Sequence, residues 1–155
     1  MSEIVEIEMK EIKIVGLRRK GAYSDVAILL PELFQKMTSA GIKMAGPPMY
    51  ICHEMTMEEV ERAMKENNAD LEVAIPVAGR IPARSDLKPN TLPGAKMAKI
   101  VHKGPYEKVG ETYTKLFEWM AQNGKQAKGP YREIYLNNPM EVPPEELLTE
   151  IHAPI

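Results

Sequence analysis

Apolar residues recur at helical spacing in a segment of the second half of the chain. They are separated by three or four positions and are Val109, Tyr113, Leu116, Phe117 and Met120. This spacing places them on one face of a helix. Asn123-Gly124 follows directly and is a typical helix stop. The pattern predicts an amphipathic helix that ends before Asn123.

Alternating and β-branched runs predict strands on both sides of that helix and of a similar one in the first half. The expected strands surround Ile12–Leu17 and Met97–Val101, both ending near Lys-Gly, and cover 49–54, 71–77, 132–136 and 148–153. Between two of them, Thr56-Met57-Glu58-Glu59 is a capping box and predicts a helix to about Asn67. Pro143 to Glu146 suits one helical turn.

The two halves of the chain resemble each other. Lys20-Gly21-Ala22-Tyr23 recurs 83 positions later as Lys103-Gly104-Pro105-Tyr106, and the same offset maps Leu33-Phe34 onto Leu116-Phe117. Towards the ends the offset falls to 78, so that Glu72 matches Glu150. The first half therefore contains five extra residues between Cys52 and Leu71. We interpret the chain as a tandem duplication of a strand–helix–strand–strand module.

This organisation predicts one domain over 1–155, with a first repeat at about 1–78, a linker at about 79–93 and a second repeat at about 94–155. The expected fold class is α+β. Two modules should form a curved, mainly antiparallel sheet with helices on one side and a ligand cleft near the pseudo-twofold axis. Pro31 interrupts the first helix, so we expect a kink there or a separate short turn over Ser24–Leu30.

Composition excludes several classes of function. The 155 residues carry 20 Lys+Arg against 22 Asp+Glu, a net charge of −2 that gives no general attraction to nucleic acid or anionic membrane. The longest aliphatic run, Val26–Leu30, is far short of a membrane span, and the N-terminus lacks a secretory signal. A single cysteine, Cys52, rules out an internal disulfide. We expect a soluble, cytoplasmic protein.

Differences between the repeats indicate where one half gained a function. In the second half Tyr113 replaces Leu30, Trp119 replaces Lys36, Glu133 replaces Tyr50, Tyr135 replaces Cys52, and His152 replaces Ala74. Strand alternation places Glu133 and Tyr135 on the same face. A carboxylate between aromatic rings on a central strand could pair with a hydrophobic cation. A solvated strand glutamate is the simpler alternative.

The other candidates also have simple structural alternatives. Trp119 and Tyr113 could belong to the core, although a buried tyrosine hydroxyl needs a partner. Tyr23 and Tyr106 occupy matched positions, which favours a structural role. The three histidines lack the spacing of a zinc site, and no glycine-rich phosphate motif or nucleophile elbow is present. We expect no metal and no cofactor.

Several motifs of the second repeat resemble the GyrI-like small-molecule-binding family, whose domain also serves as the effector-binding part of AraC-type and MerR-type multidrug-responsive regulators. They are Lys103-Gly104-Pro105-Tyr106, Leu116 to Met120, Asn123-Gly124, Gly129-Pro130, Arg132 to Asn137 and Thr149 to Pro154. The resemblance covers essentially the whole chain and is strongest over its last 55 residues. It implies a curved antiparallel sheet around a ligand cleft.

The resemblance also implies a site. The family has a buried glutamate on a strand that binds the ligand, and this residue corresponds to Glu133. The other ligand-binding candidates are Tyr135, Trp119, Tyr113, Tyr50 and His152. The first expectation is a binding protein for lipophilic or cationic small molecules, without a DNA-binding module of its own. An alternative is a hydrolase of strained electrophilic natural products that uses Glu133 and Tyr135. A third is a protein-interaction modulator of the topoisomerase-inhibitor kind. The oligomeric state stays open.

Overall fold

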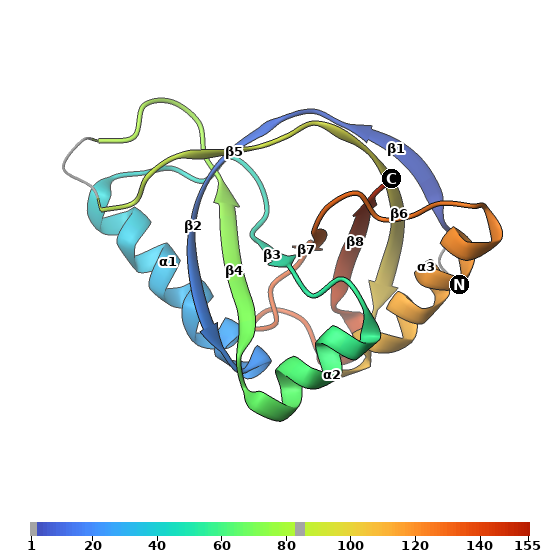
Figure 1. The fold of residues 1–155 in the computed structure, drawn as a ribbon. Coiled ribbons are helices and arrows are strands. Elements are labelled where there is room, and N and C mark those ends of the chain that lie inside the picture. The colour runs from blue at the N-terminus through green and yellow to red at the C-terminus, as the bar shows by residue number, and fades with distance from the viewer. Residues whose placement is uncertain (1–2, 83–85) are drawn as a thin grey trace.

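The structure is a computed structural model that describes residues 3–82 and 86–155. Figure 1 shows an antiparallel sheet that curls into a half-barrel, with α1 and α3 on its two flanks and α2 below. The elements, in chain order, are β1 (Val5–Met9), β2 (Ile12–Gly21), the short 3-10 turn η1 (Tyr23–Asp25), α1 (Val26–Ala40), β3 (Met49–Cys52), α2 (Met57–Glu66), β4 (Ala69–Pro76), β5 (Asn90–Leu92), β6 (Ala95–Lys103), η2 (Tyr106–Lys108), α3 (Val109–Gln122), β7 (Tyr131–Tyr135), η3 (Pro144–Glu146) and β8 (Leu148–Pro154).

The eight described strands form one sheet in the order β1-β6-β8-β7-β3-β4-β2-β5. Every pair of neighbours is antiparallel. The sheet is symmetric about its centre. Equivalent strands of the two repeats lie at equal distances from it: β7 and β3 in the middle, then β8 and β4, then β6 and β2, with β1 and β5 at the edges. This α+β architecture confirms the fold class expected from the sequence, including its duplicated module.

The strand registers show where the pseudo-twofold axis passes. Ile14 pairs with Pro76 in the first repeat, and Met97 pairs with Pro154 in the second, which are the positions related by offsets 83 and 78. At the centre of the sheet Tyr50 of β3 pairs with Glu133 of β7. These two residues occupy the same position in the two repeats, because they are 83 positions apart. The pseudo-twofold axis therefore passes between them.

The outer strands exchange between the repeats, which the sequence patterns did not predict. β1 lies at the start of the first repeat but pairs with β6 of the second, while β5 lies at the end of the expected linker and pairs with β2 of the first. The two connections pass so closely that a Cβ on Gly94 would lie 2.9 Å from the carbonyl oxygen of Met9. The linker therefore ends in a strand; its residues 83–85 lie outside the described part of the chain. The exact ends of the repeats stay a prediction.

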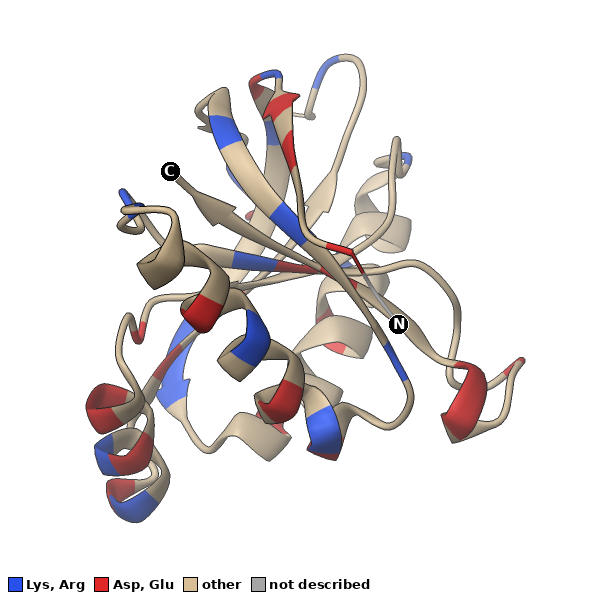
Figure 2. Ribbon diagram, turned by 90° about the vertical axis from the view of Figure 1, so that its right-hand side faces the viewer, with Lys and Arg blue, Asp and Glu red and all other residues tan. Residues whose placement is uncertain are grey.

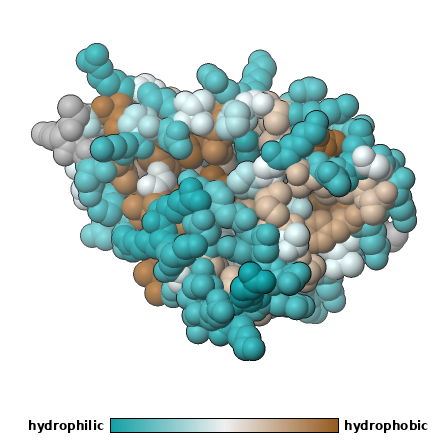
Figure 3. Space-filling model, viewed as in Figure 1, coloured by the Kyte–Doolittle hydropathy of each residue, from teal (hydrophilic) through white to brown (hydrophobic). Residues whose placement is uncertain are grey.

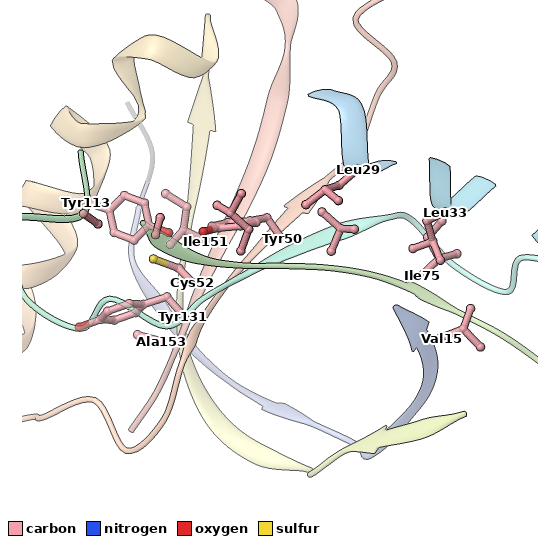
Figure 4. Packing of buried hydrophobic residues seen from close by; sticks show 14 of the residues in the cluster. Val15, Leu29, Leu33, Tyr50, Cys52, Ile75, Tyr113, Tyr131, Ile151 and Ala153 are labelled. Atoms are coloured by element: carbon pink, nitrogen blue, oxygen red, sulfur yellow. The ribbon is translucent and has the colours of Figure 1, made fainter. Parts of the chain in front are cut away.

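The main core lies between one face of the sheet and the helices. It joins Leu33 of α1, Ala63 of α2 and Leu116 of α3 to sheet residues such as Ile75 and Ile151, several of which appear in Figure 4. The opposite face carries a second, smaller cluster, which the curl of the sheet encloses. It consists of Ile14, Met49, Ile51, Ala74 and Ile134. Successive side chains along one strand are therefore buried in two different hydrophobic clusters, one on each face of the sheet.

The first part of α1 is more regular than Pro31 led us to expect. The separate turn covers only Tyr23–Asp25, and the helix continues from Val26 through Pro31 to Ala40. A proline removes one N–H donor, here the donor that would reach the carbonyl of Ala27. Both residues are exposed, so water can satisfy that carbonyl. The other helix signals are confirmed: the Thr56 hydroxyl accepts from the Glu59 N–H at 3.1 Å, and α1 ends at Gly41 with φ 72°.

Charges of both signs are interspersed over the ribbon (Figure 2), in keeping with the near-zero net charge. On the face shown in Figure 3, hydrophilic side chains cover much of the surface and leave apolar areas between them. Among the described residues, no helix has the length and apolar character needed to cross a membrane.

The duplicated core allows a direct test with one pair of equivalent residues. Leu33 and Leu116 are both fully buried. We expect Leu33→Ala and Leu116→Ala each to lower the free energy of unfolding by about 2–5 kcal/mol, because each leaves a cavity under its helix. Urea unfolding of both variants provides the measurement, with Glu58→Ala on exposed α2 as the control. A loss below about 1 kcal/mol at either position would contradict the proposed packing.

Candidate functional site

The candidate site is centred on β7, one of the two middle strands of the sheet. Tyr131, Glu133 and Tyr135 alternate along it and share the face covered by the helices, whereas Arg132 and Ile134 point to the other face. β7 lies between β3 and β8. This central position places a carboxylate where most strands present apolar side chains.

Glu133 has one direct hydrogen-bond donor. The hydroxyl of Tyr113, on α3, donates to Oε2 of Glu133 at 2.6 Å. Part of Glu133 stays accessible, but its carboxyl group is surrounded by protein. This burial raises the pKa of Glu133 to about 7, and the bond from Tyr113 only partly opposes the effect. The group is therefore poised between its neutral and charged forms near neutral pH.

Aromatic rings surround this carboxyl group. Tyr113 packs edge-on against Tyr131 with ring centres 5.8 Å apart, and Phe117 contacts both rings. On the other side Tyr106 meets Tyr135 at 5.5 Å, also edge-on. Such arrangements place ring edges against ring faces, as the quadrupole of an aromatic ring favours.

The first repeat completes the group from the opposite side of the axis. Tyr50 lies directly across from Glu133 and is buried, and its hydroxyl has no hydrogen-bond partner in the described residues. Cys52 follows on the same face, next to Tyr131, and burial raises the pKa of its thiol to about 12. Figure 4 shows Tyr50, Cys52, Tyr113 and Tyr131 converging between the sheet and the helices.

Tyr23 brings a second carboxylate close to the group. Its hydroxyl donates to Glu54 at 2.9 Å, and the other oxygen of Glu54 accepts from the backbone N–H of Asp70. Burial and then Glu54 raise the pKa of Tyr23, with a smaller contribution from Glu133. All six tyrosines of the chain thus belong to one assembly around Glu133, which we call the tyrosine cluster: Tyr23, Tyr50, Tyr106, Tyr113, Tyr131 and Tyr135.

No basic side chain accompanies this carboxylate. Within the part of the chain that the structure describes, no Lys or Arg perturbs the pKa of Glu133, and the groups that act on the neighbouring tyrosines are carboxyls, phenols and one thiol. Arg132 is adjacent in sequence but lies on the opposite face, where it donates to the carbonyl of Pro93 at 3.0 Å. The described residues also contain no group of three or more His, Cys, Asp or Glu side chains suited to a metal.

The structure brings together four of the six residues proposed from the sequence. Glu133, Tyr113, Tyr135 and Tyr50 meet at the axis. His152 is buried on the other face of the sheet, where its Nε2 lies 2.8 Å from Glu150. The pKa of His152 is lowered, mainly because the ring is buried.

Trp119 lies apart from the contacts that join these residues. It is half-buried on α3 and packs against the main core, and its backbone carbonyl accepts from Asn123. The ring contacts and hydrogen bonds around Glu133 in the described residues run through other side chains of α3, namely Tyr113 and Phe117.

Other members of the cluster were not singled out from the sequence. Tyr131 could have been found, because it continues the alternation of Glu133 and Tyr135 by one step. Tyr23 and Tyr106 occupy matched positions after the Lys-Gly turns and were assigned a structural role. Nothing in the sequence pattern brings them to Glu133, since their approach depends on the curl of the sheet.

Two depressions on the surface are lined by other residues than the tyrosines of the cluster. One, of about 280 Å³, lies beside α2 and is lined by polar side chains that include Lys20, Glu54 and Arg62. The other, of about 310 Å³, lies over β2 and includes Arg18 and Lys88. Neither is lined by Glu133. The tyrosine cluster is closely packed, and its most exposed ring is Tyr106, of which 38% is accessible.

The chain belongs to the GyrI-like small molecule binding domain family, whose pattern matches residues 2–155. Among curated protein sequences, none matches the chain significantly.

Solved structures of the same fold include the C-terminal domain of EcmrR, with a TM-score of 0.86, 21% identity, and coverage of 99% of this chain and 97% of that one. In a complex of EcmrR with DNA, the match has a TM-score of 0.85 at 21% identity. It covers 99% of this chain and only 57% of the EcmrR chain, so this chain spans little more than half of that protein.

Two further relatives are more distant. SAV2435, solved with tetraphenylphosphonium, has a TM-score of 0.65 and 16% identity, with coverage of 98% of this chain and 93% of that one. A hydrolase from Listeria innocua has a TM-score of 0.62 and 16% identity, with coverage of 98% and 91%. At these identities the similarity shows a shared fold.

The raised pKa of Glu133 predicts a pH-dependent stability. The folded state holds the proton up to about pH 7, whereas the unfolded state releases it near 4.5, the ordinary pKa of a glutamate. The contribution of this group to stability is therefore fully present below about pH 4.5 and is lost as the pH rises through 7. Relative to Glu133→Gln, the wild type should lose about 2–3 kcal/mol of unfolding free energy between pH 4.5 and 8.

Urea unfolding of both proteins across this pH range measures the difference. Glu118→Gln, an exposed change on α3, should reproduce the wild-type profile. Parallel profiles for wild type and Glu133→Gln would show that the Glu133 carboxyl has an ordinary pKa.

Proposed function

We propose that this domain binds lipophilic, aromatic cations and that Glu133 is their counter-ion. The observation that carries the proposal is a buried carboxyl group that lies among tyrosine rings and has no basic side chain beside it in the described part of the chain. Burying a carboxylate without a positive partner is unfavourable, so such a group is complementary to a ligand that supplies the charge.

The rings supply the second part of the recognition. Tyrosine faces attract a cation through the ring quadrupole, and their apolar surface suits the aromatic substituents of such a ligand. SAV2435, which shares the fold, was solved with tetraphenylphosphonium, a cation of this kind. That ligand offers no hydrogen-bond donor, so charge and aromatic contact alone would have to hold it.

The approach to Glu133 is through the rings. Glu133, Tyr135 and Tyr23 are each partly accessible, and Tyr106 lies at the surface beside Tyr135. Since the cluster is closely packed, a ligand must displace ring contacts to reach the carboxylate. We therefore expect binding to rearrange Tyr106 and Tyr135 while the central strands β3 and β7 keep their register.

Calorimetry at pH 8, where Glu133 is mostly ionised, tests the proposal. Tetraphenylphosphonium should bind the wild type, and Glu133→Gln should weaken it by about 2–5 kcal/mol, because the variant removes a desolvated charge partner. Triphenylphosphine oxide, a neutral compound with similar rings, should lose less than about 1 kcal/mol. Glu118→Gln serves as the matched control. Equal losses for the cation and the neutral compound would refute the counter-ion role.

A hydrolase is the second candidate, because a carboxyl group with a pKa of about 7 and a phenol donor at 2.6 Å has the properties of a general base near neutral pH. The role requires Glu133 to activate a water molecule against an electrophilic carbon, with Tyr113 or Tyr135 as a hydrogen-bond donor. Strained three-membered rings are suitable substrates, since ring opening consumes one water and needs no cofactor.

Mass spectrometry distinguishes the hydrolase from a pure binding protein. The protein would be incubated with a panel of electrophilic cyclopropanes and epoxides, and the products examined for the addition of one water. An enzyme should lose turnover in Glu133→Gln while its affinity for a neutral substrate changes by less than about 1 kcal/mol. A binding protein should give no product above the rate in buffer.

A further inference from the structure

Among the described residues, the groups that act electrostatically on Glu133 and on its neighbouring tyrosines are neutral or acidic. Ile151 of β8 lies beside Glu133 in register and is apolar. The titratable groups around it come from every neighbouring element: Tyr113 from α3, Tyr50 and Cys52 from β3, Tyr131 and Tyr135 from β7, Tyr23 from η1, Tyr106 from η2, Glu54 from the segment after β3, and Glu59 from α2. Among them, no group can neutralise a carboxylate.

Only one of these groups stabilises the charged form directly. Tyr113 donates a hydrogen bond to Oε2. Tyr50 lies opposite Glu133 across the strand pair, yet its buried hydroxyl makes no hydrogen bond in the described residues. Glu54 is already saturated by Tyr23 and by the N–H of Asp70. A single neutral donor does not replace the hydration that a buried carboxylate has lost.

The carboxyl group can therefore be neutralised in two ways, by a proton or by the positive charge of a ligand. We propose that the two compete for Glu133, so that a cation displaces one proton from every site that is protonated before it binds. In the empty site Glu133 carries the proton and Tyr113 donates to it. In the occupied site the O–H bond of the carboxyl group breaks, the proton passes to solvent, and the carboxylate pairs with the cation. This inference rests on the proposed function and adds its regulation by pH.

Glu133 is the only group of the cluster from which this proton can come near neutral pH. Burial raises the pKa of Tyr113 and Tyr135 far above neutrality, and that of Cys52 to about 12, so the phenols and the thiol keep their protons. The pKa of Glu133, about 7, gives a half-protonated site at that pH. His152, the nearest histidine in the adjacent strand, lies on the other face of the sheet.

The expected pH dependence follows from this competition. Above pH 8 the site is ionised, and affinity for the cation should not change with pH. Below pH 6 each further unit should weaken binding about tenfold, because a growing share of the site must first lose its proton. A neutral ligand should show the opposite trend or none, since it gains nothing from the charged form. Acidification would therefore release the cation.

Calorimetry with tetraphenylphosphonium in two buffers of different ionisation enthalpy counts the protons. The difference in observed heat at one pH gives the number released per ligand. We expect about 0.9 at pH 6, about 0.5 at pH 7 and about 0.1 at pH 8. Glu133→Gln should release none and should bind with an affinity that is independent of pH. Glu118→Gln should release protons as the wild type does.

The outcomes separate this inference from the proposed function. If tetraphenylphosphonium binds in a Glu133-dependent manner but releases no proton at pH 6, exchange is refuted and the counter-ion role stands. If it fails to bind even at pH 8.5, both fail. Proton release that persists in Glu133→Gln would assign the titrating group to another residue and would also overturn the inference.

Discussion

The buried carboxyl group of Glu133 is the constraint around which the centre of this molecule is arranged. It lies on a middle strand, in register with Tyr50, and it accepts one hydrogen bond from Tyr113. A carboxyl group in that position must be either neutral or paired, because the described residues around it offer no positive charge. Its raised pKa and its proposed role as the counter-ion of lipophilic cations both follow from the lack of a basic partner in the described residues.

The duplication explains how such a group can be accommodated. Two copies of one module meet along β3 and β7, and the rest of each module, including Leu33 or Leu116 under its helix, repeats the same packing. The hydrophobic core is therefore distributed over both repeats. This arrangement leaves the two axial positions free to differ, and they hold Tyr50 in one copy and Glu133 in the other. The same reasoning accounts for Leu30 and Tyr113, of which only the tyrosine reaches the carboxylate.

The face opposite the cluster has a different chemistry. Arg132 and His152 are buried there, next to each other in register, and each has one nitrogen without a partner in the described residues. The sheet thus separates the buried guanidinium of Arg132 from the buried carboxyl group of Glu133. Strand alternation is the physical reason, since neighbouring residues of β7 point to opposite faces. A change of register by one residue would place Arg132 on the face of the tyrosines and Glu133 on the opposite face.

The sequence by itself determined the module, the helix ends and the alternation of β7. Periodicity, capping residues and internal repetition are local or self-referential signals, so they could predict α3, the Thr56 cap and the shared face of Glu133 and Tyr135. Only the tertiary structure decided which strands meet. The exchange of β1 and β5 between repeats, the pairing of Tyr50 with Glu133, and the approach of Tyr23 and Tyr106 all join residues far apart in the chain. Packing also places His152 on the face of the sheet opposite Glu133, and it places Trp119 on another side of α3 than Tyr113. The pKa of Glu133 is likewise decided by the tertiary structure, because desolvation depends on every segment that surrounds the carboxyl group.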